Sequence, residues 1–280
     1  MKIFRRRLIQ IAATLLTNPH VANFLNGKLY RGELKNFCAP GLNCWSCPAA
    51  AFSCPIGAMQ TIGGTGGKFS FYAAGFTLLI GLLLGRAVCG FLCPFGLIQE
   101  LLNKIPSPKI SLPKIFLRVK YFLLIIFVLI LPVVTKYGEP TFCEYICPAG
   151  TLEAGLPLIA AHKELRDVLG NLFALKISIL FAVIIACILI HRFFCRVMCP
   201  LGAIYGLLNK YSFSQINFAA DKCIGCGRCK NVCPLDLDPT KEFNSVECVR
   251  CERCKKICPT KAFHRVSGGG AKRYPPLTKS

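Results

Sequence analysis

The sequence predicts a mainly α-helical chain in which a polytopic membrane domain of about four helices precedes a small α+β domain. Three observations support this class: 54% of the 280 residues are apolar, one cysteine-containing phrase is repeated along the chain, and two dense cysteine runs follow it. Soluble domains rarely have so apolar a composition. We therefore expect the lipid bilayer to be the first partner of this protein.

Four apolar runs are candidate membrane helices, at residues 8–25, 69–85, 115–134 and 172–190. The last three approach the roughly 20 residues that a bilayer-spanning helix needs. Buried helices of a soluble core are the alternative, which three such runs disfavour. The first run is interrupted by Gln10, Asn18 and Pro19, so a tilted span, a re-entrant hairpin and a signal peptide are all considered. Because no small-residue cleavage site follows, we favour an uncleaved first helix.

The basic residues predict how the chain is oriented. Residues 86–120 contain six Lys or Arg against one acid, whereas residues 136–171 contain three against five acids. Because basic residues accumulate on the cytoplasmic side, we expect a multi-pass protein of the cytoplasmic (inner) membrane with its N-terminus and last domain in the cytoplasm. This anchoring, together with thiolates that the formal net charge of +21 counts as neutral, explains the basic excess. We therefore expect no nucleic-acid partner.

The end of the chain repeats a metal-binding pattern. "CIGCGRCKNVCP" and "CVRCERCKKICP" both read C-x2-C-x2-C-x3-C-P, the pattern in which three thiolates bind one [4Fe–4S] cluster and the fourth binds its neighbour. Zinc sites use paired C-x2-C units instead. The expected ligand sets are Cys223, Cys226, Cys229 with Cys258, and Cys248, Cys251, Cys254 with Cys233. Residues 221–265 resemble bacterial two-cluster ferredoxins, and we expect a ferredoxin domain over 213–266.

The phrase Cys-Pro-x-Gly occurs four times before that domain, at Cys54, Cys93, Cys147 and Cys199. In the last three copies another cysteine lies four residues upstream, at Cys89, Cys143 and Cys195. Cys89 precedes Cys195 by 106 residues, which indicates an internal duplication. We expect two membrane repeats, 1–112 and 113–212. Their cysteine segments are 38–57 and 89–94 in the first repeat, and 143–148 and 195–200 in the second.

The duplication predicts where the pairs meet. Two parallel repeats are related by an axis along the membrane normal, so corresponding loops lie at the same face. Two cysteines cannot complete a four-thiolate site, but two pairs can. We expect one inner cluster, bound by Cys89, Cys93, Cys195 and Cys199, and one outer cluster, bound by Cys47, Cys54, Cys143 and Cys147. Cys38 and Cys44 are alternatives in the outer cluster. A cluster bound by the four cysteines of the first loop alone is a further alternative.

The C-x3-C-P phrases at Cys89 and Cys195, each after an apolar run and followed by the ferredoxin runs, resemble a group of membrane-bound 4Fe–4S proteins. The group includes the quinol-dehydrogenase subunit of periplasmic nitrate reductase and the polyferredoxin part of the nitrous-oxide reductase regulator. The resemblance implies electron transfer between a quinone pool or a soluble carrier and a partner redox enzyme. The outer cysteines 38–54 and 143–147 depart from that pattern.

These observations favour an electron-transfer subunit of an oxidoreductase system over a stand-alone enzyme. Four [4Fe–4S] clusters are expected as cofactors, with iron bound through the cysteines named above and quinol as one candidate partner. No catalytic residue is expected, because "IGGTGGKF" at 62–69 fits no nucleotide-binding motif and is interpreted as a linker. Residues 267–280 are expected to form a flexible basic tail. A redox or maturation enzyme at the outer face and a cluster-based sensor are the alternatives.

Overall fold

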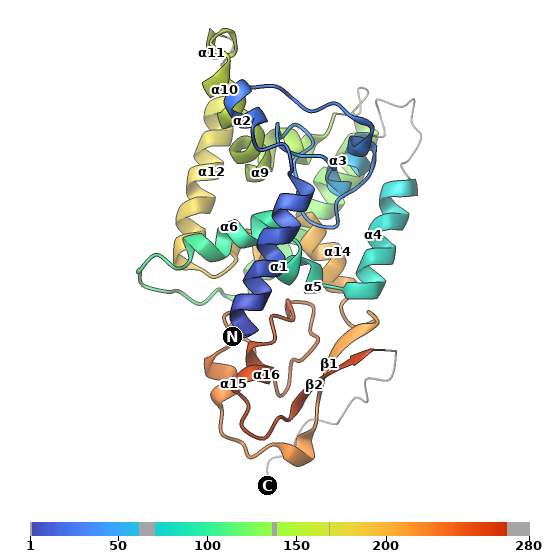
Figure 1. Ribbon diagram of the computed structural model, residues 1–280, viewed down its shortest axis with the longest axis vertical. Coiled ribbons are helices and arrows are strands. Elements are labelled where there is room, and N and C mark those ends of the chain that lie inside the picture. Colours follow the sequence, from blue (N-terminus) through green and yellow to red (C-terminus); the bar gives the residue numbers. More distant parts are fainter. Residues whose placement is uncertain (1, 62–70, 136–138, 168, 268–280) are drawn as a thin grey trace.

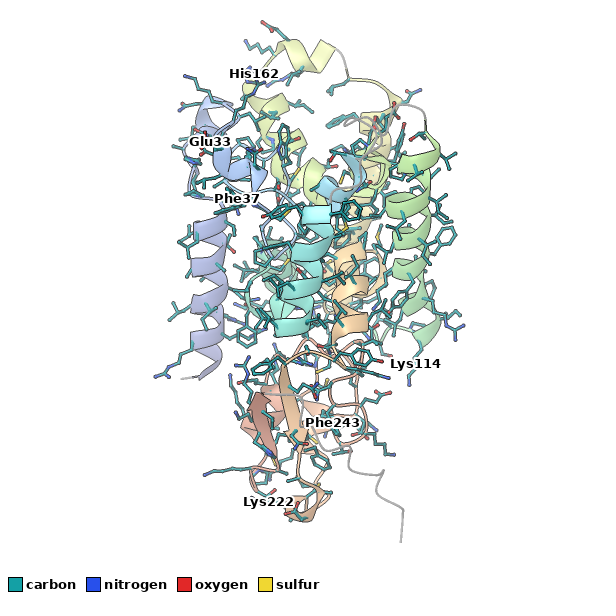
Figure 2. The ribbon with its side chains drawn as sticks, turned by 90° about the vertical axis from the view of Figure 1, so that its right-hand side faces the viewer. Glu33, Phe37, Lys114, His162, Lys222 and Phe243 are labelled. Atoms are coloured by element: carbon teal, nitrogen blue, oxygen red, sulfur yellow. The ribbon has the colours of Figure 1, made fainter. Side chains whose placement is uncertain are left out.

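The computed structural model describes residues 2–61, 71–135, 139–167 and 169–267. Its helical part occupies most of the long axis, and a lobe with a two-stranded sheet lies at one end (Figure 1). Figure 2 places Lys222 of that lobe at one extreme and His162 near the other. The expectation of a mainly α-helical chain is confirmed, and a small two-stranded sheet follows the helices in the sequence.

The first apolar run does not form a single helix. Helix α1 covers Lys2–Thr17, and the short α2 covers Asn23–Asn26. The expectation of one helix over 8–25 is therefore wrong, because Pro19 has no N–H to donate and disfavours the helical conformation of Asn18. Helix α4 covers Phe71–Leu84. Residues 69 and 70 of the expected second helix, and the expected linker, fall outside the described residues.

Two helices among the described residues are long and apolar enough to cross a membrane. One runs continuously over Lys114–Val134, through η3 (Lys114–Arg118), α7 (Val119–Leu123), the π-helical η4 (Leu124–Ile130) and α8 (Leu131–Val134). The other is α12, Asn171–Leu189. With 21 and 19 residues, they would span about 31 and 28 Å. Both agree closely with the expected ranges, whereas the expectation of four spans stays a prediction.

The outward faces of the helical part are apolar. In the two long helices only 28% and 17% of the apolar stretch is buried, whereas a core helix of a soluble protein is buried along most of its length. Phe122, Ile125, Leu175 and Phe181 are exposed in these helices, and Leu79 is exposed in α4. Large apolar side chains thus face outward around the helical part.

Short helices fill the space between the long ones. They are η1 (Glu33–Asn36), α3 (Pro55–Gln60), α5 (Ala87–Phe91), α6 (Pro94–Leu102), η5 (Phe142–Ile146), α9 (Pro148–Gly150), η6 (Thr151–Gly155), α10 (Leu156–Ala161), α11 (Glu164–Asp167), α13 (Phe193–Val197) and α14 (Pro200–Leu208). One large cluster of buried residues passes through them and includes cysteines from both ends of the helical part, and a smaller cluster forms around Cys47.

The terminal lobe is built on two antiparallel strands, β1 (Ser214–Phe218) and β2 (Phe263–Ser267), with Ser214 opposite Ser267 and Phe218 opposite Phe263. Its helical turns are η7 (Ala220–Lys222), α15 (Arg228–Asn231) and α16 (Arg253–Ile257). Because Ser267 belongs to β2, the expected tail cannot begin there. Residues 268–280 lie outside the described residues.

Candidate metal centres

The inner site consists of Cys89, Cys93, Cys195 and Cys199, and the structure brings these four cysteines together. Cys89 lies in α5 and Cys195 in α13, while Cys93 and Cys199 directly precede α6 and α14. All four are buried. Burial raises the pKa of the Cys93 and Cys199 thiols, and the neighbouring Cys195 and Cys89 raise it further. Two thiols from each repeat therefore lie within electrostatic reach of one another.

The Cys-Pro-x-Gly phrase folds identically in the two repeats. The cysteine before each proline is extended, and the proline occupies the first helical turn, where its missing N–H costs nothing. A Cβ on Gly96 would lie 2.9 Å from the carbonyl oxygen of Cys89, and one on Gly202 would lie 2.8 Å from that of Cys195. The glycine is therefore needed to let the two cysteines of each phrase approach.

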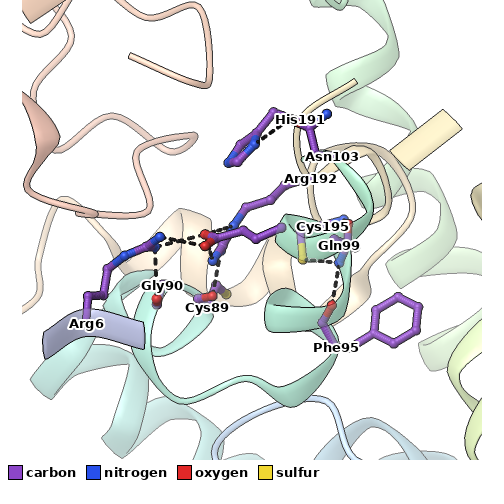
Figure 3. Close-up of polar contacts among 10 residues, drawn as sticks. Arg6, Cys89, Gly90, Phe95, Gln99, Asn103, His191, Arg192 and Cys195 are labelled. Atoms are coloured by element: carbon purple, nitrogen blue, oxygen red, sulfur yellow. Dashed lines mark hydrogen bonds and ion pairs between the residues drawn. The ribbon is translucent and has the colours of Figure 1, made fainter. Parts of the chain in front are cut away.

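Two buried arginines tie the repeats together crosswise. Arg86 donates from Nη2 to the carbonyl oxygen of Cys195 at 3.0 Å, and Arg192 donates from Nη1 to that of Cys89 at 2.5 Å; Figure 3 shows the second contact. Each arginine lies three residues before the first cysteine of its own phrase. Sequence reasoning missed both residues, although their equal position in the repeat was the available signal.

Each arginine has its own buried carboxylate. Arg192 pairs with Glu100 at 2.6 Å, and Glu100 also pairs with Arg6 of α1 at 2.5 Å. Burial alone would raise the pKa of Glu100, but Arg192 and Arg6 outweigh it and hold this pKa at about 2. The buried arginines therefore place positive charge beside the inner site, where the thiolates of a cluster would be negative.

A glutamine supplies a hydrogen bond to sulfur at the inner site. Gln99 donates from Nε2 to Sγ of Cys195 at 3.0 Å and accepts from its backbone N–H at 3.3 Å (Figure 3). Gln99 lies six residues after Cys93, so it reaches from one repeat to the cysteine of the other. This is a second contact across the repeats that sequence reasoning missed.

The outer site is a cavity of about 730 Å³ near the other end of the helical part. Four cysteines line it: Cys44, Cys54, Cys143 and Cys147. Burial raises the pKa of the Cys143 thiol, and Cys147, Cys54 and Cys44 raise it further in that order. The structure thus brings the expected Cys54, Cys143 and Cys147 together, and adds Cys44.

Contacts at the outer site repeat those of the inner site. Gln60, six residues after Cys54, donates from Nε2 to Sγ of Cys143 at 3.3 Å. Glu153, six residues after Cys147, accepts from the backbone N–H of Cys44 at 3.1 Å. Gln99 likewise accepts from the backbone N–H of Cys195. Cys44 therefore corresponds in the outer site to Cys195, the first cysteine of its pair, in the inner site. Burial raises the pKa of Glu153 to about 7.

The remaining cysteines of the helical part lie elsewhere. Cys47, which the sequence analysis preferred, does not line the cavity and packs with Ala49 and Ala50. Cys38 is buried, and its backbone pairs with that of Ser53 in an isolated parallel β-bridge. Cys187 is buried within α12, and its sulfur lies 3.7 Å from Oε1 of Gln99.

The terminal lobe contains two further cysteine sets. The proximal ferredoxin site lines a small cavity with all four expected residues, Cys233, Cys248, Cys251 and Cys254. Burial raises the pKa of Cys254 to about 12, and Cys248, Cys251 and Cys233 contribute. The expected distal ferredoxin site is Cys223, Cys226, Cys229 and Cys258. Cys223, Cys229 and Cys258 pack on a common apolar cluster with Cys254, whereas Cys226 is exposed.

The proximal site packs directly against the inner site. A Cβ on Gly90, between Cys89 and Cys93, would lie 2.5 Å from the carbonyl oxygen of Val249, between Cys248 and Cys251. Arg86 donates to Val246 O at 2.6 Å and pairs with Glu247 at 2.9 Å. Glu247 also pairs with Lys120. A buried ion network thus joins the lobe to the helical part beside the thiols of both sites.

The inner site is joined to the outer site by one stretch of chain. A Cβ on Gly41 would lie 2.8 Å from the Cα of Cys93, and three residues later comes Cys44 of the outer site. The fully buried Tyr205 donates from its hydroxyl to Pro40 O at 2.8 Å. Residues 40–44 therefore touch the inner site and carry a thiol of the outer site.

The donor sets suit clusters better than single ions. Among the described residues, no group of three His, Cys, Asp or Glu side chains could hold one metal ion. In a [4Fe–4S] cluster each thiolate binds a different iron, so the four sulfurs do not converge on one point. Sets of four thiols, with amide donors to sulfur and buried arginines nearby, fit such a group.

Family comparisons agree with this chemistry. Residues 67–113 and 120–159 match a 4Fe-4S binding domain, and these ranges contain the pairs Cys89–Cys93 and Cys143–Cys147. Residues 193–244 match the LdpA Fe-S cluster-binding domain. No solved structure shows a significant match. The chain therefore contains iron–sulfur cluster-binding domains.

Relatives come from bacteria and archaea. An uncharacterized protein of Methanocaldococcus jannaschii is 30% identical over 61% of this chain and 67% of its own length. The chain belongs to the family of this archaeal protein. YccM of Escherichia coli K12, whose name assigns it to electron transport, is 31% identical over 65% of this chain and 53% of its own length. MauN of Paracoccus denitrificans, a methylamine utilization ferredoxin-type protein, is 27% identical over 57% and 50%. The match thus spans about half of the length of these two relatives.

Proposed function

We propose that this protein is a membrane-embedded electron conduit with four [4Fe–4S] clusters in series, at the distal, proximal, inner and outer sites. The observation that carries the proposal is that each site contacts the next. Three distal cysteines share one apolar cluster with Cys254 of the proximal site. Gly90 meets Val249 between the proximal and inner sites, and Gly41 meets Cys93 on the stretch that leads to Cys44 of the outer site. Clusters so placed could exchange electrons with little other chemistry from the protein.

The ligand assignment follows the contacts across the repeats. At the inner site we propose Cys89, Cys93, Cys195 and Cys199, and at the outer site Cys44, Cys54, Cys143 and Cys147. Cys44 replaces Cys47, which the sequence analysis preferred, because the N–H of Cys44 donates to Glu153 as that of Cys195 donates to Gln99. When bound, each cluster would supply a one-electron redox centre, and the glutamine and arginine contacts would adjust its potential.

The exposed apolar faces support insertion of the helical part in a bilayer, because burying them in lipid removes them from water. We propose that the lobe lies on the cytoplasmic side, since the sequence connecting α4 to the Lys114–Val134 helix is basic. The outer site then lies toward the opposite face. Electrons would cross most of the membrane between a donor or acceptor at each end.

The distal site supports a soluble protein partner at the cytoplasmic end. Cys226 is exposed, and the neighbouring Ile224 is 67% exposed. Exposed Lys222, Arg228 and Lys230 lie within a few residues of them in the sequence, in the lobe whose extreme is marked by Lys222 in Figure 2. We propose that a carrier with an acidic face docks there, because complementary charge accelerates encounter. Quinol or a redox enzyme would exchange electrons at the outer site.

The test is iron and acid-labile sulfide per chain in anaerobically purified protein, with electron paramagnetic resonance of a Cys93→Ser, Cys199→Ser variant. The proposal predicts about sixteen iron atoms, falling by about four in the variant while the ferredoxin signals remain. About eight iron atoms, unchanged in the variant, would show that only the ferredoxin lobe binds clusters and would refute the proposed conduit.

A further inference from the structure

A third cavity, of about 490 Å³ and lined mainly by polar residues, lies between the lobe and the helical part. Its wall includes Arg7 of α1, Lys104 just after α6, Lys109, His191 just after α12, and Arg253 of α16. Four separate stretches of the chain thus bring basic side chains to one space. None of them belongs to the cysteine sites described above.

Positive charge in this cavity is only partly neutralised. Among the described residues, the side chains of Arg7, Lys104 and Arg253 have no hydrogen-bond or ion-pair partner, in contrast to Lys109, which donates to Asn103 O at 2.7 Å and Ile188 O at 2.8 Å. Three cationic groups therefore face the cavity without a counterion.

The carboxylates that also line the cavity are engaged elsewhere. Glu100 is held by Arg6 and Arg192, and Asp236 lies 3.8 Å from Arg196. The cavity therefore offers a net positive environment that an anion could neutralise, and its volume exceeds that of a single phosphate group.

The depth of the cavity indicates which anion is available. Leu189, the last residue of α12, lies on its wall beside Ile110, whose N–H donates to Leu189 O at 3.1 Å. If α12 spans the bilayer, as the proposed function requires, the cavity lies where the hydrocarbon core gives way to headgroups. Basic pockets at this level suit lipid phosphates.

We propose that Arg7, Lys104 and Arg253 bind the phosphate of an anionic ligand in this cavity, which at headgroup depth is that of an anionic phospholipid. The site contacts the electron path, because Pro234 and Arg253 line it and are adjacent to Cys233 and Cys254 of the proximal site. A bound anion adds negative charge beside that cluster and lowers its reduction potential. The choice of lipid over free phosphate and the effect on the reduction potential rest on the proposed function, whereas anion binding in the cavity does not.

The test uses the full chain in detergent with its clusters intact. Thermal unfolding is followed while short-chain phosphatidylglycerol, short-chain phosphatidylcholine or inorganic phosphate is added. The variant Arg7→Gln, Lys104→Gln, Arg253→Gln is compared with a control, Arg5→Gln, Lys210→Gln, Lys255→Gln. The control removes equal charge at Arg5 and Lys255, two residues from Arg7 and Arg253, and at Lys210, which has the position of Lys104 in the second repeat. None of the three lines the cavity. The reduction potential of the proximal cluster is titrated with and without ligand.

We expect phosphatidylglycerol to stabilise the native protein and the control, and to lower the proximal potential in both. The cavity variant should bind it about tenfold more weakly or worse, and Lys104→Gln alone should show a smaller loss if the triple variant does not fold. Stabilisation by phosphate too would identify free phosphate as sufficient. No stabilisation by either ligand, or equal loss in cavity and control variants, would overturn the proposal. Extraction of the protein from membranes by carbonate would refute only its insertion in the bilayer. The proposal that the cavity binds phosphate would then still stand.

Discussion

Replacing Glu247 by glutamine tests whether a buried ion network holds the lobe against the helical part. Glu247 is buried between Arg86 and Lys120, both with no exposed surface. The change keeps the side-chain shape but leaves two cations without their shared carboxylate. Removing one partner of a buried ion pair costs about 3–5 kcal/mol, because the remaining charge stays desolvated. We therefore expect the lobe to open about two to four orders of magnitude more often.

Hydrogen exchange measures this opening directly. The amide of Cys248, which donates to Ser245 O, should lose protection by that factor. Glu242→Gln is the matched control, because its pair with Lys114 is 3.6 Å long and the two side chains are 39% and 87% exposed. An exposed pair contributes less than about 1 kcal/mol. Equal loss of protection in the two variants would refute the argument.

Three further predictions concern the sites. Cys44→Ser should lower iron by about four atoms per chain, whereas Cys47→Ser should not; the opposite pattern would restore Cys47 as a ligand. Gln99→Leu removes an N–H donated to sulfur and should lower the inner-cluster potential in a redox titration, so an unchanged potential would contradict this role. Burial, then a neighbouring arginine, lowers the pKa of His191 to about 3 from 6.5. Neutral His191 makes its full contribution to the free energy of unfolding above pH 6.5. This contribution decreases as pH falls toward 3, by about 1 kcal/mol between pH 7 and 5.5. His191→Asn should flatten that change in thermal unfolding, and a persistent slope would exclude His191 as its source.

The expectation of two cluster sets in the lobe came from spacing within short segments. In the C-x2-C-x2-C-x3-C-P runs, short spacing keeps the first three thiols of each run together, whereas the place of Cys233 beside Cys248–Cys254 came from the known ligand pattern of such runs. The duplication predicted that Cys89 and Cys93 would meet Cys195 and Cys199, because related segments fold alike and pair across an axis.

The first outer loop shows where sequence reasoning ended. Cys44 and Cys47 are three residues apart, and nothing in their spacing says which one faces Cys143. That choice depends on Glu153, from a distant segment, accepting the Cys44 N–H. The break in the first helix could be anticipated from Pro19, but the position of the chain after it could not.

By itself, the sequence determined the apolar class of this protein, its duplicated phrases, and the cysteines able to bind clusters, since each follows from composition or short-range spacing. Only the tertiary structure decided that Arg86 and Arg192 cross between the repeats, that Glu247 fastens the lobe beside the inner site, and that free basic groups line a third cavity. Those contacts join residues about a hundred or more apart. Their geometry arises from packing of the whole chain, which no local pattern specifies.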